Sequence, residues 1–290
     1  MRYLTPLRYP GGKSRLAPFV KALLRLNNLG DAHYVEPYAG GASVALALLL
    51  GEYVTHIYVN DLDRSVYAFW YTVLNETEAL CRRIRDAKLS IAEWRRQRTV
   101  QQRAGEANLL ELGFSTFYLN RTNRSGIIHA GGVIGGLGQA GEWKLDARFY
   151  RDGLIKRIEA IADYRDRISL YNRDAAVLLR QLVPCLPAKS LLYLDPPYYV
   201  KGKRRLYANY YVHSDHAQIA RLLAGAERPW LVSYDDVPEI CGLYKKFRYR
   251  KYRLPYTAAD RYEGCEVIFF SHELAVPSAS NPLSVAGRMG

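Results

Sequence analysis

The sequence is poor in cysteine, in acidic residues and in long hydrophobic runs. Its cysteines, Cys81, Cys185, Cys241 and Cys265, are scattered and form no Cys-x-x-Cys pair, which argues against a disulfide framework and a cysteine metal site. The longest apolar stretch, Ala42 to Leu50, is about half a membrane span. The N-terminus lacks the basic and apolar parts of a secretory leader. These absences predict a globular cytoplasmic protein without membrane or metal.

Other absences exclude nucleotide triphosphate and metal sites. Gly12-Lys13-Ser14 matches the end of a P-loop, but Leu7 stands where a P-loop requires its first glycine, and no strand precedes it. His213 and His216 are close in sequence, but no third ligand is nearby. Helix capping explains the segment 213–218, because Asp215 and Gln218 have the spacing of a capping box.

Basic residues are abundant and clustered. Lysine and arginine number 41 against 28 aspartate and glutamate, a net charge of +13, which indicates a polyanionic partner. Residues 244–253 interleave six cations with aromatic rings, and Lys201, Lys203, Arg204 and Arg205 form a second cluster. Cations that neutralise phosphates beside rings that stack on bases are typical of nucleic-acid grooves. A charged edge strand that prevents aggregation is the alternative for residues 244–253.

Short apolar strands alternate with helical patterns, which predicts an α/β fold around a mostly parallel sheet of seven strands. The expected strands are 33–36, 56–60, 168–172, 191–194, 230–233, 247–254 and 265–271, and the expected helices between them are 42–50, 175–182 and 215–223.

Residues 71–164 interrupt this alternation. The stretch 73–103 is charged and helical in pattern, and residues 131–141 contain six glycines, which predicts a hairpin or a mobile loop. We therefore expect an inserted, mainly helical and hairpin domain at 71–164. It divides a sheet domain into residues 1–70 and 165–275, and residues 276–290 form a flexible tail.

The most informative segment is Asp195-Pro196-Pro197-Tyr198, which ends the apolar run 191–194. Open α/β sheets bind ligands at the carboxyl ends of their strands. Proline fixes φ and donates no N–H, so the turn is stiff and its carbonyls stay free. Asp195 and the Pro196 carbonyl could each accept one hydrogen of an exocyclic amine, while Tyr198 stacks on its ring. This arrangement predicts a site for a base with an amino group.

A cofactor turn is indicated by Gly40 and Gly41, between a predicted strand and a predicted helix. Glycines there permit close approach of the backbone to a ligand. Asp61 ends the next strand about 20 residues on, as expected for a ribose contact. The turn lacks the full glycine pattern of a pyrophosphate site, which favours S-adenosylmethionine. Asp174 either reaches the cofactor's adenine or caps the helix from Ala175.

Four segments in order resemble the Dam-like (D12 class, α-group) adenine-N6 DNA methyltransferases: residues 6–13, 35–43, 58–61 and 195–198. The resemblance runs from about residue 4 to 272. It implies a Rossmann-like methyltransferase sheet, methyl transfer from S-adenosylmethionine to adenine N6 in a specific duplex DNA sequence, base flipping, and residues 71–164 as the target-recognition domain.

The resemblance also implies roles for individual residues. Catalysis falls to Asp195, Pro196, Pro197 and Tyr198, with Asp195 also near the cofactor. Cofactor binding falls to Tyr9, Pro10, Gly11, Gly12, Lys13, Glu36, Pro37, Tyr38, Gly40, Gly41, Ala42, Ser43, Asp61 and Asp174; many relatives carry tryptophan where this chain has Tyr9. DNA binding falls to Arg8, Asn120, Arg121, Asn123, Arg124, Lys201, Lys203, Tyr207, Tyr211, Lys245, Arg248 and Arg250.

Several alternatives stay open. Cytosine-N4 methyltransferases share the exocyclic amine but more often carry serine at the position of Asp195, and RNA adenine and protein glutamine methylases usually carry asparagine there. Pro184-Cys185 precedes the strand and lacks the companions of a cytosine-C5 nucleophile. The intact motifs disfavour a silent DNA-binding protein. The sequence leaves open the recognition site, a restriction partner, and whether the chain is a monomer or a homodimer.

Overall fold

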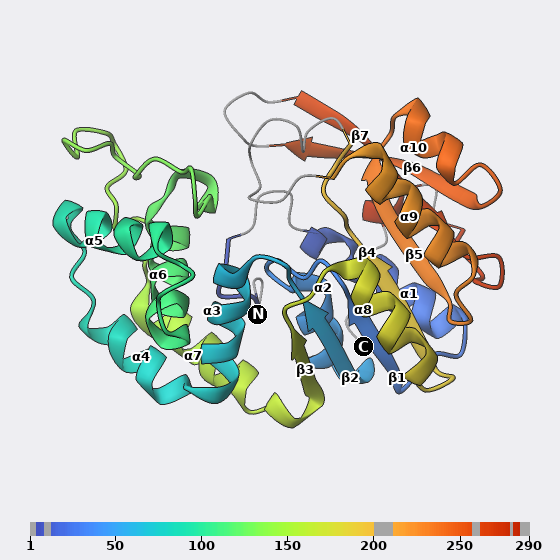
Figure 1. Ribbon diagram of the computed structural model, residues 1–290, viewed down its shortest axis with the longest axis horizontal. Helices are drawn as coiled ribbons and strands as arrows, with labels where there is room; N and C mark the ends of the chain where they lie inside the picture. The colour runs from blue at the N-terminus through green and yellow to red at the C-terminus, as the bar shows by residue number, and fades with distance from the viewer. Residues whose placement is uncertain (1–3, 9–12, 200–210, 257–261, 279–280, 285–290) are drawn as a thin grey trace. The chain divides into compact units, whose positions relative to one another are not determined.

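The computed structural model describes residues 4–8, 13–199, 211–256, 262–278 and 281–284 (Figure 1). Its contacts divide the chain into two compact units. The helical unit comprises residues 1–12 and 61–172, and the sheet unit comprises residues 13–60 and 173–290. The expected insert, 71–164, lies within the helical unit. None of the helices in the described ranges is long and apolar enough to span a membrane.

Seven strands form one sheet in the order β3-β2-β1-β4-β5-β7-β6. Their bounds are β1 Ala32–Glu36, β2 Val54–Asn60, β3 Ile168–Tyr171, β4 Ser190–Leu194, β5 Trp230–Asp235, β6 Arg248–Tyr256 and β7 Tyr262–Phe270. Strand β1 is parallel to β2 and β4, and β4 is parallel to β5. Strand β7 is antiparallel to β5 and β6. The predicted Rossmann-like sheet of seven mostly parallel strands is confirmed.

The helices of the sheet unit are α1 Ala17–Leu26, α2 Ser43–Leu49, α8 Ala175–Leu182, α9 His213–Ala224 and α10 Pro238–Leu243, with 3-10 turns at Lys13–Leu16, Val183–Cys185 and Pro282–Ser284. Helix α9 begins two residues before the predicted start. The Oδ2 atom of Asp215 accepts the N–H of Val212 at 2.8 Å, so this carboxylate caps from inside the first turn. The predicted capping box, with Asp215 as the cap and Gln218 as its partner, was therefore wrong: Val212 is the cap and Asp215 is the third helical residue.

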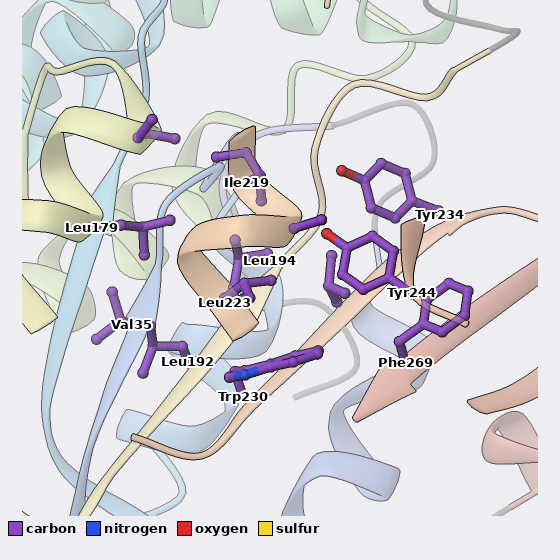
Figure 2. Close-up of a cluster of buried hydrophobic side chains, with 14 of the residues drawn as sticks. Val35, Leu179, Leu192, Leu194, Ile219, Leu223, Trp230, Tyr234, Tyr244 and Phe269 are labelled. Atoms are coloured by element: carbon purple, nitrogen blue, oxygen red, sulfur yellow. The ribbon is translucent and has the colours of Figure 1, made fainter. Parts of the chain in front are cut away.

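One buried apolar cluster of the sheet unit lies between the central strands and helices α8, α9 and α10. Figure 2 shows Ile219 and Leu223 of α9 beside Leu192 and Leu194 of β4. Parallel strands are buried on both faces and therefore carry continuous apolar runs, as β4 does with all five residues buried. Each fully buried leucine contributes about 1.5–3 kcal/mol. This packing makes β4 a rigid support for the segment that follows it.

The helical unit contains α3 Arg64–Asn75, α4 Thr77–Asp86, α5 Ile91–Gln102, α6 Leu109–Thr122 and α7 Arg151–Ala162, with 3-10 turns at Arg124–Gly126 and Arg165–Arg167. The stretch 73–103 was expected to be helical throughout, but it spans the end of α3 and two further helices. Ser90 causes the second break, because its Oγ accepts the N–H of Glu93 at 3.2 Å and starts α5. Helix α6 is the centre of this unit, buried from Leu112 to Thr122.

The glycine-rich segment 131–141 is a loop organised by one glutamine. The Nε2 of Gln139 donates to the carbonyls of Ile134 at 2.8 Å and Gly136 at 2.6 Å, and its Oε1 accepts the N–H of Leu145 at 2.9 Å. Gly135 and Gly136 have φ of +82° and +76°, a conformation that favours glycine. The segment is thus a loop, one of the two forms predicted, although Val133 within it is buried.

Candidate active site

The segment 195–198 directly follows β4, which lies between β1 and β5 in the sheet. The sequence predicted this position at the carboxyl end of a buried strand. The strand residues are fully buried, whereas the Asp195 side chain is 26% exposed. A carboxylate held by a rigid strand yet still accessible can meet a ligand.

Both observed contacts of Asp195 involve the same carboxylate oxygen. Ser233 Oγ, on the neighbouring strand β5, donates to Oδ1 of Asp195 at 2.8 Å. The Lys13 ammonium lies 3.4 Å from that oxygen. The Tyr193 hydroxyl is 3.0 Å from Ser233 Oγ and extends the chain. Within the described ranges Oδ1 is thus occupied, and Oδ2 is the oxygen that can accept a hydrogen from a ligand.

The electrostatic surroundings of Asp195 oppose its ionisation. Burial is the main cause that raises the pKa of Asp195 above its ordinary value, and the carboxylate of Glu266 adds to the effect. The Lys13 ammonium and the Ser233 hydrogen bond act in the opposite direction. A carboxylate with a raised pKa is a better proton acceptor near neutral pH.

A buried carboxylate, Glu266 of β7, collects hydrogen bonds from three elements. Its Oε1 accepts the Tyr198 hydroxyl at 2.5 Å, and its Oε2 accepts the Tyr252 hydroxyl at 2.5 Å. The Lys13 ammonium lies 3.2 Å from Oε2, contacts the Tyr198 hydroxyl, and sits 4.7 Å from that ring's centroid. Lys13 therefore joins the carboxylates of Asp195 and Glu266. Its predicted contact with the cofactor's methionine end stays a prediction.

Sequence reasoning missed Ser233, Tyr252 and Glu266. Glu266 had a usable signal: it precedes four apolar residues, Val267 to Phe270, in a strand that is expected to be buried. A carboxylate in such a strand requires hydrogen-bonding partners. Ser233 and Tyr252 had no comparable signal.

The turn between β1 and α2 holds the predicted cofactor residues 36–43. Oε1 of Glu36 accepts the Tyr34 hydroxyl at 3.1 Å and the Ala45 N–H at 3.0 Å. Burial raises the pKa of Glu36 to about 8, so this carboxyl is largely protonated at neutral pH. The side chain thereby ties the end of β1 to the first turn of α2.

The backbone of this turn is bonded to the neighbouring strand β2. The Ala39 N–H donates to the Asn60 carbonyl at 2.8 Å, and Asn60 Nδ2 donates to the Pro37 carbonyl at 2.8 Å. Gly40 and Ala42 have φ of +47° and +46°, which is strained for alanine. The binding of S-adenosylmethionine at this turn stays a prediction. Glu36 is compatible with it, because a buried carboxyl would be ionised by a nearby positive charge such as a sulfonium or an amino group.

Other predicted site residues in the sheet unit have defined partners. Oδ1 of Asp174 accepts the N–H groups of Ala176 at 2.9 Å and Val177 at 3.1 Å, so the helix-cap alternative is present, and its adenine contact stays a prediction. The Tyr38 and Tyr211 hydroxyls are 2.9 Å apart. The structure thus brings Tyr38, expected at the cofactor, next to Tyr211, expected to bind DNA.

The helical unit holds Asp61, the predicted ribose ligand, directly after β2 in the chain. Its Oδ1 accepts the N–H of Asp63 at 2.9 Å, and Asp63 caps α3 through the N–H of Ser65 at 2.8 Å. The Oδ2 of Asp63 also pairs with His129 Nε2 at 2.6 Å. Seven other predicted site residues lie outside the described residues: Tyr9, Pro10, Gly11, Gly12, Lys201, Lys203 and Tyr207.

Three residues predicted to contact DNA are buried in the helical unit. The Asn120 side chain accepts the N–H of Arg8 and donates to the carbonyl of Arg8, each at 2.7 Å. Arg121 donates to the Pro6 carbonyl, and burial lowers its pKa to about 9. Oδ1 of Asn123 accepts the Trp94 indole N–H at 2.7 Å. In this structure these side chains hold residues 6–8 and α5 against α6, whereas Arg124 of the same segment is exposed.

The predicted basic residues of the sheet edge differ in their contacts. Lys245 and Arg250 are exposed. Arg248 donates to the carbonyls of His272 at 2.8 Å and Leu274, so it holds the segment after β7. Because β6 is an edge strand, both interpretations of this cluster, phosphate binding and protection of the edge, remain applicable to Lys245 and Arg250.

Comparison with known proteins identifies the family. The model of the D12 class N6 adenine-specific DNA methyltransferases matches residues 9–256, most of the chain. The chain belongs to this family. It is therefore a methyltransferase of the class that uses S-adenosylmethionine, with an intact Asp-Pro-Pro-Tyr segment at the end of β4.

Solved structures give only a distant likeness to this D12-class chain. The rRNA methyltransferase aviRa from Streptomyces viridochromogenes shares 16% identity over 96% of this chain and 89% of its own, with a TM-score of 0.41. TrmN from Thermus thermophilus shares 13% identity over 86% of this chain and 46% of its own, with a TM-score of 0.36. These scores are too low to support an argument about substrate. No curated protein matches the sequence.

Proposed function

We propose that this protein transfers a methyl group from S-adenosylmethionine to N6 of adenine in a specific duplex DNA sequence. The observation that carries the proposal is the state of Asp195 at the end of β4. Its Oδ1 is held by Ser233 at 2.8 Å, its side chain is 26% exposed, and among the described residues Oδ2 remains available as an acceptor. An exocyclic amine next to Pro196 would meet two acceptors at once.

The two acceptors address the main chemical difficulty. The lone pair of an adenine amine is delocalised into the ring, so the amine is a weak nucleophile. Hydrogen bonds to Asp195 and to the Pro196 carbonyl would hold both N–H groups and favour a pyramidal nitrogen. Bound S-adenosylmethionine would supply an electrophilic methyl group, which its sulfonium activates. The protein's contribution is positioning with electrostatic support.

The fate of the proton also points to Asp195. A nitrogen that gains a methyl group carries a positive charge until one of its protons leaves. Asp195 is in hydrogen-bond reach of that nitrogen in the proposed geometry, and its raised pKa suits it to accept the proton. The reaction then requires no covalent enzyme intermediate.

Duplex DNA requires that the target base leave the stack before reaction. The Tyr198 ring directly follows the two prolines, and its hydroxyl is held by Glu266 at 2.5 Å. A ring fixed in this way can support the flipped base. The net charge of +13 and the exposed Arg124, Lys245 and Arg250 support a nucleic-acid substrate.

The test uses purified protein with isotope-labelled S-adenosylmethionine and genomic duplex DNA, matched single-stranded RNA and a protein extract in parallel. Digestion of the DNA to nucleosides and mass spectrometry should place the label in N6-methyladenine. Asp195→Ala should abolish labelling, and Glu227→Gln, whose side chain is 83% exposed, should not. Label in N4-methylcytosine, in RNA or in protein would overturn the proposal.

A further inference from the structure

We propose that Glu266 is a positioning residue that holds Tyr198 and Lys13 in their working orientations. The inference rests on the proposed function and adds a residue that lies on another strand, 68 positions from Tyr198. Glu266 acts through the side chains of Lys13 and Tyr198.

The buried surroundings of Glu266 indicate that its carboxylate has a specific role. Glu266 is fully buried in β7, where the buried apolar residues Val267 to Phe270 follow it. Removing an ionised carboxylate from water costs several kcal/mol unless it is paired and hydrogen-bonded. An apolar residue would fill this position without that cost. Glu266 instead meets three donors, the hydroxyls of Tyr198 and Tyr252 and the Lys13 ammonium.

The contact with Tyr198 fixes an aromatic ring. A tyrosine side chain has two rotatable bonds, and a hydrogen bond at its far end removes most of the remaining freedom. The 2.5 Å bond to Oε1 of Glu266 is such a bond. Lys13, which contacts the same hydroxyl and lies over the ring, restrains it from a second side. A base that stacks on this ring therefore meets an ordered surface, and less side-chain entropy is lost when it binds.

The contact with Lys13 reaches Asp195. The ammonium lies 3.2 Å from Oε2 of Glu266 and 3.4 Å from Oδ1 of Asp195. Glu266 therefore competes with Asp195 for one positive charge. Its own negative charge raises the pKa of Asp195. Removing that charge should lower the pKa of Asp195 and weaken it as a proton acceptor.

Tyr252 distinguishes this role from general packing. It is paired with Glu266 across β6 and β7 and donates to Oε2. Tyr252→Phe removes one hydrogen bond to Glu266. Tyr53, before β2 in the sheet unit, also accepts one hydrogen bond at its hydroxyl, from Arg25 at 3.0 Å, and lies outside every predicted site. Tyr53→Phe is therefore the matched control.

The experiment compares wild type, Glu266→Gln, Tyr252→Phe and Tyr53→Phe. We measure kcat and KM for duplex DNA, cofactor affinity by calorimetry, the fluorescence of 2-aminopurine at the target position, and the pH profile of kcat. Thermal unfolding identifies variants that fail to fold. Among the described residues, the charged and titratable groups that act on Glu266 or Asp195 include Lys13, Tyr34, Glu36, Tyr193, Tyr198 and Tyr252. The substitution Glu266→Gln leaves all of these groups in place.

Glu266→Gln should lower kcat about 10-fold to 100-fold, the value of one or two charge-assisted hydrogen bonds. It should weaken the 2-aminopurine signal and move the acid limb of the profile to lower pH. Tyr252→Phe should give a smaller loss in kcat and in the fluorescence signal, and Tyr53→Phe none.

An unchanged kcat and fluorescence signal in folded Glu266→Gln would overturn the inference. Should that variant fail to fold, the same result in Tyr252→Phe would overturn it. Wild-type protein that methylates no adenine would instead contradict the proposed function, so the two failures are distinct.

Discussion

Ser233 Oγ donates a 2.8 Å hydrogen bond to Oδ1 of Asp195 from the neighbouring strand β5. This bond decides which carboxylate oxygen is left for a substrate. Ser233→Ala should therefore lower kcat about 10-fold, as expected for one hydrogen bond to a charged group, without changing cofactor affinity. Steady-state kinetics and calorimetry check this. Tyr193→Phe, which removes the next hydroxyl of the chain, should have a smaller effect, and equal losses in both variants would contradict the assignment.

Asp195→Asn should reduce methyl transfer by about 100-fold or more, because the amide loses the charge that accepts a proton while it retains one acceptor oxygen. Cofactor binding should persist. Single-turnover assays at saturating cofactor measure the loss. In wild type the acid limb of kcat should lie above the ordinary aspartate range, since burial raises the pKa of Asp195. An acid limb near pH 4 would contradict that environment.

Glu36 makes folding stability depend on pH. Its pKa rises from 4.5 in the unfolded chain to about 8 in the folded protein, so the folded state holds an extra proton between these values. The stabilising contribution is fully present below about pH 4.5 and is lost as pH rises to about 8, on the order of 1 kcal/mol per pH unit. Glutamine resembles the protonated carboxyl at every pH. In urea unfolding, the free energy of unfolding should therefore be similar for wild type and Glu36→Gln at pH 5 and larger for Glu36→Gln at pH 8. A constant difference across this range would contradict the prediction.

Asp61→Ala should weaken S-adenosylmethionine binding and spare DNA affinity at saturating cofactor. The expected cause is the loss of a carboxylate that accepts ribose hydroxyls. Calorimetry with the cofactor measures the change. Asp152→Asn, an exposed carboxylate of α7, is the control. Cofactor affinity equal to wild type would remove Asp61 from the site.

Arg121 and Arg124 lie three residues apart but should behave differently. Arg121→Ala should lower the unfolding temperature, because its buried guanidinium holds the Pro6 carbonyl. Arg124→Ala should leave stability unchanged and alter sequence preference, since an exposed arginine in the expected recognition segment is available to read guanine, a contact worth about 1–3 kcal/mol. Thermal unfolding and methylation of a randomised duplex library separate the two effects. An unaltered preference in Arg124→Ala would exclude it as a base-reading residue.

Charge reversal at Lys245 and Arg250 should weaken binding to every duplex alike and reduce its salt dependence, by about one unit of slope per lost phosphate contact. Titrations at several salt concentrations measure this. Reversal of Glu227 to lysine controls for net charge. Unchanged binding would leave these residues as protection of the exposed edge of β6.

The sequence by itself determined the sheet, the position of Asp195 and the family. Continuous apolar runs specify buried parallel strands, and two prolines after Asp195 specify a stiff turn, because both effects depend on neighbours in the chain. The breaks within 73–103 were missed, since the cap of Ser90 on Glu93 is a single bond in a charged stretch that otherwise favours helix.

Only the tertiary structure decided the partners of the site. Ser233 lies 38 residues from Asp195, and Glu266 lies 253 residues from Lys13. The burial of Asn120, Arg121 and Asn123 was likewise decided only by the tertiary structure, because the sequence motif led us to expect side chains accessible to DNA. Burial depends on what the fold packs against a side chain, and segments far apart in sequence supply that packing.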